Sequence, residues 1–143
     1  MDMNRMTIKL QEALQSASAL AMRRGHQGID VEHLLLALME QEGGIAGFLF
    51  EQAGVSPAAV RQALTKVAQV HGPGAAPGQI HLTPRLGSLL TKAEDRMKEL
   101  RDEFVSVEHI ILAMVEEGGI FRRLNLTHER LLTALQQVRG NQR

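Results

Sequence analysis

Apolar residues recur at helical spacing along most of the chain. Between Met6 and Ala21 they fall at steps of three and four residues, which places them on one stripe of a helix. The segment Val31–Gln41 is apolar on almost all sides, a pattern typical of a buried helix. Alternation of apolar and polar residues is nowhere sustained over the length of a strand. The pattern therefore predicts an all-α fold.

Capping residues, prolines and glycines mark the ends of these helices. We expect Asp30 and Ser106 to act as N-caps, because their side chains can accept hydrogen bonds from first-turn N–H groups. Proline after serine or threonine opens two further helices, since its missing N–H costs nothing at the first helical position. The predicted helices are one from Met6 to about Gly25, Val31–Gln41, Ile45–Ala53, one starting at Pro57, one starting at Pro84, Val107–Glu116, Ile120–Leu124 and one from Thr127 to about Val138.

The stretch 7–40 is repeated at 83–116. A shift of 76 positions aligns the two copies without a gap and matches Val-Glu-His at 31–33 with Val-Glu-His at 107–109. A unit of this length exceeds the roughly 20–50 residues of most solenoid repeats. Two copies therefore predict one globule with pseudo-twofold symmetry rather than an open array.

We divide the chain on this basis into two four-helix repeats and a linker. The first repeat covers residues 6–70, the second covers 83–143, and the segment 71–82 between them is rich in glycine and proline. All of 1–143 is expected to form one domain, because 143 residues is close to the commonest domain size. The linker lacks the Lys-Ser/Thr pair that completes a phosphate-binding P-loop, so we expect no nucleotide site there.

Composition argues against several classes of partner. Sixteen basic and sixteen acidic side chains cancel, so no broad electrostatic field favours nucleic acid or an anionic membrane. No run approaches the roughly 18 apolar residues of a membrane span, and the N-terminus shows no apolar leader. Cysteine is absent, which removes disulfides and thiolate chemistry. We expect a cytoplasmic protein that binds neither nucleic acid nor membrane.

Catalytic and metal-binding motifs are missing as well. His33 and His109 each follow a glutamate, but a zincin needs His-Glu-x-x-His, and alanine stands four residues after each histidine. We therefore predict no catalytic residue and no metal ligand, and interpret both histidines as first-turn residues, partly exposed and hydrogen-bonded. A small helical enzyme that depends on a metal or a ligand stays open as a distant alternative.

A helix-turn-helix DNA binder is the other class considered. Val31–Gln41 and Ile45–Ala53 are joined by a glycine turn, as in that motif. A recognition helix must present Arg, Lys, Asn or Gln to base edges. The second of these helices carries one Gln on an otherwise largely apolar surface, so DNA binding is disfavoured.

The duplicated plan resembles the double N-terminal repeat of the Clp family, a domain that heads ATP-driven AAA+ unfoldases. The likeness rests on Thr7 and Thr83 at the heads of the first helices, and on Val-Glu-His-Leu/Ile-x-Leu-Ala at the start of the second helices. It covers essentially the whole chain. The segments 98–109 and 138–143 resemble the ClpB disaggregase branch more than the protease-coupled ClpC and ClpA branches.

This resemblance implies a non-catalytic domain that binds exposed apolar segments of unfolded or aggregated polypeptides and passes them to a hexameric ATPase ring. It implies no cofactor in this domain, with ATP and Mg²⁺ in the AAA+ domains of a parent protein. Other implied partners are those AAA+ domains and, through the parent, the Hsp70-family chaperones. We expect the isolated domain to be a monomer. The alternative within the family is an adaptor-binding N-domain of a ClpC- or ClpA-type unfoldase.

The expected client site is a groove where the two half-domains meet, since a groove lined by aliphatic side chains accepts apolar segments without reading their sequence. The resemblance implies roles for Thr7, Asp102 and Glu108, against which each has a structural explanation as a cap or a loop residue. Some relatives carry leucines where this chain has Lys92, Arg96 and His109, which suggests a cationic edge and clients with acidic residues beside apolar ones. The expected substrate-binding residues are Thr7, Leu89, Leu90, Lys92, Arg96, Met97, Asp102, Phe104, Glu108 and His109.

Overall fold

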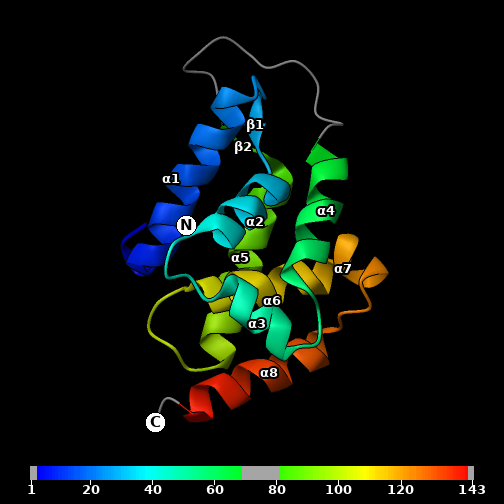
Figure 1. Cartoon of the computed structure of the whole chain (residues 1–143). Coiled ribbons are helices and arrows are strands. Elements are labelled where there is room, and N and C mark those ends of the chain that lie inside the picture. Colours follow the sequence, from blue (N-terminus) through cyan, green and yellow to red (C-terminus); the bar gives the residue numbers. More distant parts are fainter. Residues whose placement is uncertain (1–2, 69–80, 142–143) are drawn as a thin grey trace.

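Helices make up most of the computed structural model, which describes residues 3–68 and 81–141 (Figure 1). The predicted all-α fold is confirmed, and each predicted helix is present with its ends shifted by three residues at most. The helices are the 3₁₀ turn η1 (Met3–Arg5), α1 (Ile8–Arg23), α2 (Val31–Glu40), α3 (Ala46–Gln52), α4 (Pro57–Ala68), α5 (Pro84–Glu99), α6 (Val107–Glu117), α7 (Ile120–Arg123) and α8 (His128–Asn141).

Capping explains why the helices begin where they do. Thr7 and Thr83 lie at matching positions, and each hydroxyl accepts a hydrogen bond from the backbone N–H three residues on, at 3.3 and 3.1 Å. Asp30 caps α2 and Ser106 caps α6, each in a capping box whose third residue is a histidine. Gly25 adopts φ +70° after α1, a conformation that a residue without a Cβ tolerates best.

The two repeats pack around one core. Within each repeat the first helix packs on the second, α1 on α2 and α5 on α6, while α3 lies against α8 and α4 against α7. These contacts exchange the two halves, as the predicted pseudo-twofold symmetry requires. The helices α2 and α6 are the most completely buried, and their residues Leu34, Leu38, Ile110 and Ile111 are almost fully buried. The repeats are therefore layers of one globule rather than separate bodies.

Two short backbone pairings join the repeats at matching places. The strands β1 (Gly28–Ile29) and β2 (His81–Leu82) pair in parallel, with Ile29 opposite Leu82, at the end of the molecule away from α8 (Figure 1). A shift of 76 converts this pair into Met6 opposite Val105, which also form a parallel bridge. We call the β1–β2 pairing the first seam and the Met6–Val105 pairing the second seam.

Two sequence-based expectations need correction at this level. Strands were not expected, yet β1 and β2 exist, because two residues are too few to show alternation. Residues 69–80, which hold most of the predicted linker 71–82, lie outside the described residues, whereas its last two residues form β2. His33 and His109 were expected to be partly exposed, but each is only 1% exposed, because α2 and α6 are buried on nearly every side.

Candidate functional site at the junction of the repeats

The second seam brings the start of α1 against the start of α6. The Thr7 N–H donates to the Val105 carbonyl at 2.9 Å, and the Val105 N–H donates to the Arg5 carbonyl at 2.8 Å. Met6 and Val105 are buried, whereas Thr7 and Ser106 stay half-exposed beside them. The backbone pairing thus holds two helix N-termini together at the molecular surface.

A cavity of about 200 Å³ opens at this seam. It combines residues of the first repeat with the first turn of α6. Two of the residues expected in the client site, Thr7 and Glu108, line it, and apolar surface comes from Ile45 and Val107. Its lining residues are Thr7, Lys9, Gln41, Gly43, Gly44, Ile45, Ser106, Val107 and Glu108.

Both predicted acidic residues are held by one cation from α8. Arg139 Nη2 lies 2.6 Å from Glu108 Oε2 and 2.8 Å from Asp102 Oδ2. Its Nε donates to the same glutamate oxygen at 2.9 Å, and its Nη1 to Asp102 Oδ1 at 3.3 Å. Charge-assisted bonds of this forked kind are stronger than neutral ones. Arg139 was not among the expected residues, because its partners stand 31 and 37 positions earlier in the chain.

The pairing shifts the ionisation of two of these groups. Burial opposes the charged form of Asp102, but hydrogen bonds from Arg139 and His109 outweigh it and lower the pKa of the carboxyl group. Burial likewise opposes the charged form of Arg139, and its hydrogen bonds to Asp102 and Glu108 raise the pKa of the guanidinium. Both side chains therefore stay charged near neutral pH.

Behind these charges, His109 ties the loop before α6 to the helix itself. The Ser106 N–H donates to His109 Nδ1 at 2.8 Å, so this nitrogen carries no proton. The other ring nitrogen, Nε2, lies 2.7 Å from Asp102 Oδ2 and must be the donor in that bond. His109 is thus a buried positioning residue for Asp102. The predicted cationic edge at position 109 is not present, because the ring is buried.

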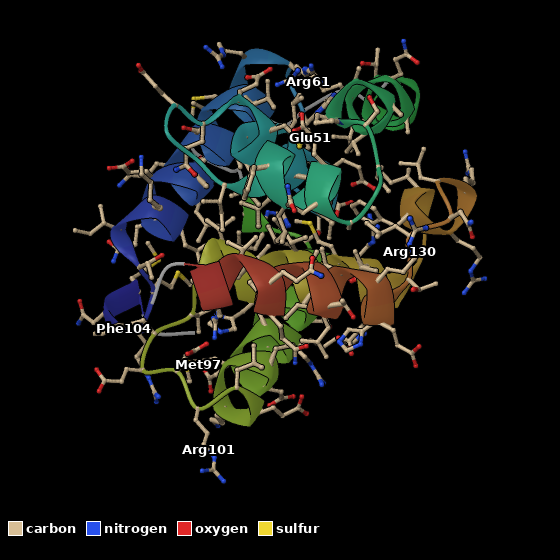
Figure 2. All side chains as sticks on the ribbon, turned by 60° about the horizontal axis from the view of Figure 1, so that its bottom comes forward. Glu51, Arg61, Met97, Arg101, Phe104 and Arg130 are labelled. Carbon is tan, nitrogen blue, oxygen red and sulfur yellow. The ribbon has the colours of Figure 1, made fainter. Side chains whose placement is uncertain are left out.

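Exposed apolar side chains gather around the second seam. Met3 is 43% exposed, Ile8 72% and Phe104 49%, and each stands within three residues of Met6 or Val105 in the sequence. In Figure 2 Phe104 lies on the loop beside the N-terminal segment, away from the body of the helices. None of the three lines the cavity itself, so they add exposed apolar surface near the seam, of the kind that marks interaction surfaces.

Three of the expected lining residues belong to the core instead. Leu89, Leu90 and Met97 are 0%, 4% and 2% exposed, because their stripe on α5 packs against α6. In this conformation they offer no surface to a client. The apolar part of the expected lining therefore reduces to Phe104.

The two remaining basic residues lie on α5 and do not line the seam cavity. Lys92 is exposed, as expected of an edge residue. Arg96 forms ion pairs with two carboxylates: its Nη1 lies 2.6 Å from Glu99 and its Nε lies 3.3 Å from Glu116. Pairing neutralises most of its charge, so the cationic edge proposed for this groove reduces to Lys92.

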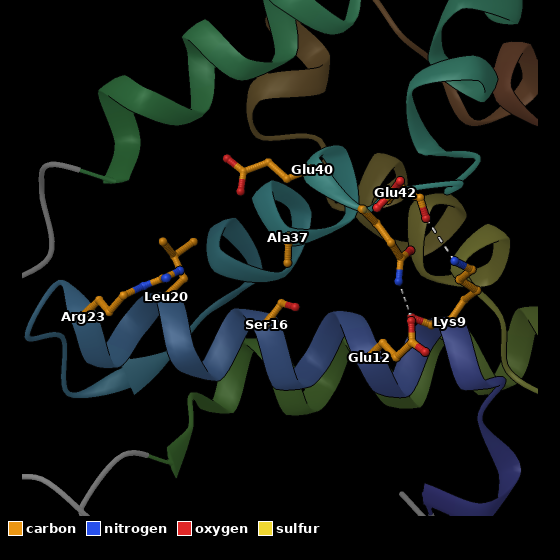
Figure 3. A pocket seen from close by; sticks show the side chains of 9 residues that line it. Lys9, Glu12, Ser16, Leu20, Arg23, Ala37, Glu40 and Glu42 are labelled. Atoms are coloured by element: carbon orange, nitrogen blue, oxygen red, sulfur yellow. Dashed lines mark hydrogen bonds between the residues drawn. The ribbon is translucent and has the colours of Figure 1, made fainter.

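A second cavity, of about 620 Å³, lies between α1 and α2 (Figure 3). Lys9 and Gln41 line both cavities and form the wall between them. Lys9 Nζ donates to the Glu42 carbonyl at 3.0 Å, and Gln41 Nε2 donates to the Lys9 carbonyl at 2.8 Å. The amide oxygen of Gln41 is buried without a hydrogen-bond partner among the described residues. The remaining lining is largely charged, so it suits an apolar segment less well than the seam does.

Residues 3–68 and 81–141 offer neither a metal-binding cluster nor a helix that could span a membrane. Within these residues no group of three or more His, Asp or Glu side chains is placed to hold a metal ion. None of the helices described there is both long and apolar enough to cross a lipid bilayer.

Known proteins share this duplicated plan. Residues 5–128 match the Clp repeat (R) N-terminal domain. The chain belongs to this family. The ClpB chaperone of Nitratidesulfovibrio vulgaris is 44% identical over 153 aligned residues, which cover 100% of this chain and 18% of that protein. This identity supports the predicted resemblance to the ClpB branch. The matched family is a non-catalytic N-terminal domain, and the enzymatic parts of its ClpB and Hsp104 members lie elsewhere in those proteins.

Solved structures of Clp N-domains share the fold. The Hsp104 N-terminal domain of Candida albicans superposes with a TM-score of 0.81 at 22% identity, covering 96% of this chain and 93% of that one. A ClpV N-domain solved in complex with a VipB peptide gives a TM-score of 0.75 at 22% identity, covering 90% and 82%. At this level of identity the likeness shows the fold alone.

Proposed function

We propose that this Clp N-domain binds exposed apolar segments of unfolded or aggregated polypeptides at the second seam, without catalysing a reaction. The observation that carries the proposal is the cavity at the junction of the repeats, together with the exposed side chains of Met3, Ile8 and Phe104, which flank the paired residues Met6 and Val105 in the sequence. An apolar segment that covers these side chains gains roughly 25 cal/mol for each Å² of apolar surface removed from water. Contacts of this kind require no defined sequence.

The dimensions of the cavity suit a transient hold. A space of about 200 Å³ takes a few side chains of a client rather than a folded partner. Micromolar to millimolar affinity corresponds to roughly 4–8 kcal/mol, and such a segment is released readily. The ClpV N-domain that forms a complex with a VipB peptide supports this proposal, because a domain of the same fold accepts a peptide.

The parent protein belongs to the proposal too. The chain spans about a fifth of the length of the ClpB relative that it matches. We propose that it works as the N-terminal domain of a ClpB-type disaggregase, in the cytoplasm. AAA+ domains of the same parent would bind ATP and Mg²⁺ and receive the client, and Hsp70-family chaperones would cooperate through that parent.

A chemical-shift map of the isotope-labelled domain tests the site. An unfolded, apolar client should shift the backbone resonances of Thr7, Ile45 and Glu108 and leave those of the α1–α2 cavity unchanged. Phe104→Ser should weaken binding about five-fold, since an aromatic side chain at such a surface contributes on the order of 1 kcal/mol. Met22→Ser is the matched control, because Met22 is 52% exposed at the opposite end of α1.

The proposal fails if clients shift resonances elsewhere and leave the seam unchanged. It also fails if Phe104→Ser and Met22→Ser weaken binding equally. Shifts confined to Ser16, Leu20 and Ala37 would place the site in the cavity of Figure 3 instead.

A further inference from the structure

We infer that Arg139 determines the charge preference of the second seam: by neutralising Glu108 and Asp102 from outside the cavity, it makes the site indifferent to charges that flank an apolar client. This inference rests on the proposed function. It deepens that function by naming the client class as apolar segments with either flanking charge. Arg139 acts as a positioning and specificity-determining residue and does not line the cavity.

Positive and negative side chains balance around the cavity. Glu108 and Lys9 line it directly, while Asp102 and Arg139 stand behind Glu108 in one hydrogen-bonded network. Two carboxylates and two cations sum to zero. Without Arg139 the sum is −1, and the uncompensated charge would fall on a glutamate only 19% exposed. A client with lysines beside its apolar core would then be attracted.

The first seam uses a different cation for the equivalent glutamate. There Arg85 pairs directly with Glu32, the counterpart of Glu108, at 2.5 Å. The counterpart of Arg85 is Lys9, which donates to a backbone carbonyl instead. The cation supplied by the duplicated motif is therefore used elsewhere at the second seam. Arg139, from α8, takes its place.

Arg139 has no basic counterpart in the first repeat. It stands in the last turn of α8, where the sequence of the first repeat has Ala68 at the aligned position. The duplicated plan does not require an arginine there. The guanidinium holds both carboxylates with four hydrogen bonds while its side chain stays 30% exposed. Arg139 therefore offsets the charge of both carboxylates, and a client cation gains little from Glu108.

The test measures affinities for three peptides with one apolar core, flanked by lysine, glutamate or serine. The wild-type domain should bind the lysine and glutamate peptides within about a factor of two of each other. Arg139→Gln should favour the lysine peptide by about five-fold, the size expected for a partly exposed charge pair. Arg139→Lys, which keeps the charge, should restore most of the wild-type ratio.

A mirror-image variant keeps the test independent of the folding of Arg139→Gln. Glu108→Gln leaves the network with a net charge of +1 and should favour the glutamate peptide by a similar factor. Arg23→Gln is the matched control: it removes an exposed arginine from the last turn of α1, at the end far from Lys9 (Figure 3). That control should keep the wild-type ratio.

The outcomes separate this inference from the proposed function. If both Arg139→Gln and Glu108→Gln bind all three peptides in the wild-type ratio, Arg139 does not determine charge preference, while seam binding stands. A wild-type domain that already discriminates by five-fold or more overturns the inference in the same way. If none of the three peptides binds the wild-type domain, the proposed function itself is overturned.

Discussion

The two seams are built from the same sequence and differ in what neutralises their acidic side chain. At the first seam Arg85 of α5 pairs with Glu32 at 2.5 Å and with Glu117 at 3.3 Å, so the duplicated helices supply the cation themselves. At the second seam the equivalent cation, Lys9, donates to the backbone carbonyl of Glu42 instead, and Arg139 of α8 pairs with Glu108. Of the large exposed apolar side chains in the described residues, Met3, Ile8 and Phe104 lie within three positions of the second pairing, whereas Leu82 alone belongs to the first.

This difference shows how a duplicated domain can specialise without changing its fold. The backbone pairings, the caps and the buried histidines are retained in both copies, because the core depends on them. The side chains that border each seam are free to diverge. The first seam takes its cation from the duplicated helix α5, and the second has its charge balance set from another helix, α8.

The buried histidines should show the largest effects. His33 Nε2 bonds His26 at 2.7 Å, whereas His109 Nε2 bonds Asp102 at the same distance. His33→Ala and His109→Ala should each lower the free energy of unfolding by about 2–3 kcal/mol, through a lost buried hydrogen bond and a cavity. His33→Ala should cost more, since its partner His26 is buried, whereas Asp102 is partly exposed and can bond to water.

Urea denaturation measures both losses. His128→Ala is the control, because His128 is 35% exposed and should change stability by less than about 0.5 kcal/mol. A larger loss for His109→Ala than for His33→Ala would contradict the comparison. It would mean that the Asp102 network, rather than burial, fixes these helix starts.

Removing an ion pair at either seam should have the next largest effect on the free energy of unfolding. Arg139→Gln should lower the free energy of unfolding by about 1–2 kcal/mol, because it leaves two partly buried carboxylates side by side. Arg85→Gln should cost less, since the Arg85 side chain is 44% exposed and screened by water. Thermal unfolding of both variants at low salt gives the order. Equal losses would remove the distinction between the seams.

Sequence predicted the helical frame well, for physical reasons. Thr7, Thr83 and Asp30 are caps whose hydrogen bonds span three residues or fewer, so a short window of sequence contains the whole interaction. Gly25 likewise acts locally. The periodicity of apolar residues then assigns each helix a buried face.

The candidate site could be predicted only in part, because its contacts are distant in sequence. Thr7 and Glu108 come together only after Met6 pairs with Val105, nearly a hundred positions later. Periodicity also does not say whether an apolar stripe faces the core or a groove, and this is why Leu89 was expected in the lining. Arg139 carried one local signal, a basic residue in the last turn of a helix, which usually indicates only a favourable helix dipole.

A smaller effect on the free energy of unfolding is expected from the loss of the Asp102 ion pair at low pH. The pKa of Asp102 is lowered in the folded state, so its ion pairing stabilises the fold above the ordinary aspartate pKa and is lost as the pH falls through the lowered value. Asp102→Asn should therefore cost about 1 kcal/mol at pH 7, and this cost should shrink as the pH falls below the ordinary aspartate pKa. Asp95→Asn, on the exposed face of α5, is the control. A pH-independent loss would assign the effect to hydrogen bonding by the amide instead of to charge.

The smallest effect is expected where the two repeats differ in how their helix pairs meet. Leu20 lines the cavity between α1 and α2, and its counterpart Arg96 reaches across from α5 to Glu116 on α6. Arg96→Leu should change the free energy of unfolding by less than about 0.5 kcal/mol, because ion pairs near the surface contribute little and leucine suits a helix as well as arginine does. Urea midpoints measure the change, with Lys98→Leu as control, since Lys98 is 60% exposed on the same helix. A loss above about 1.5 kcal/mol would mean that charge holds α5 on α6 where packing holds α1 on α2, and the symmetry of the two repeats would then extend to their backbone but not to the forces that maintain it.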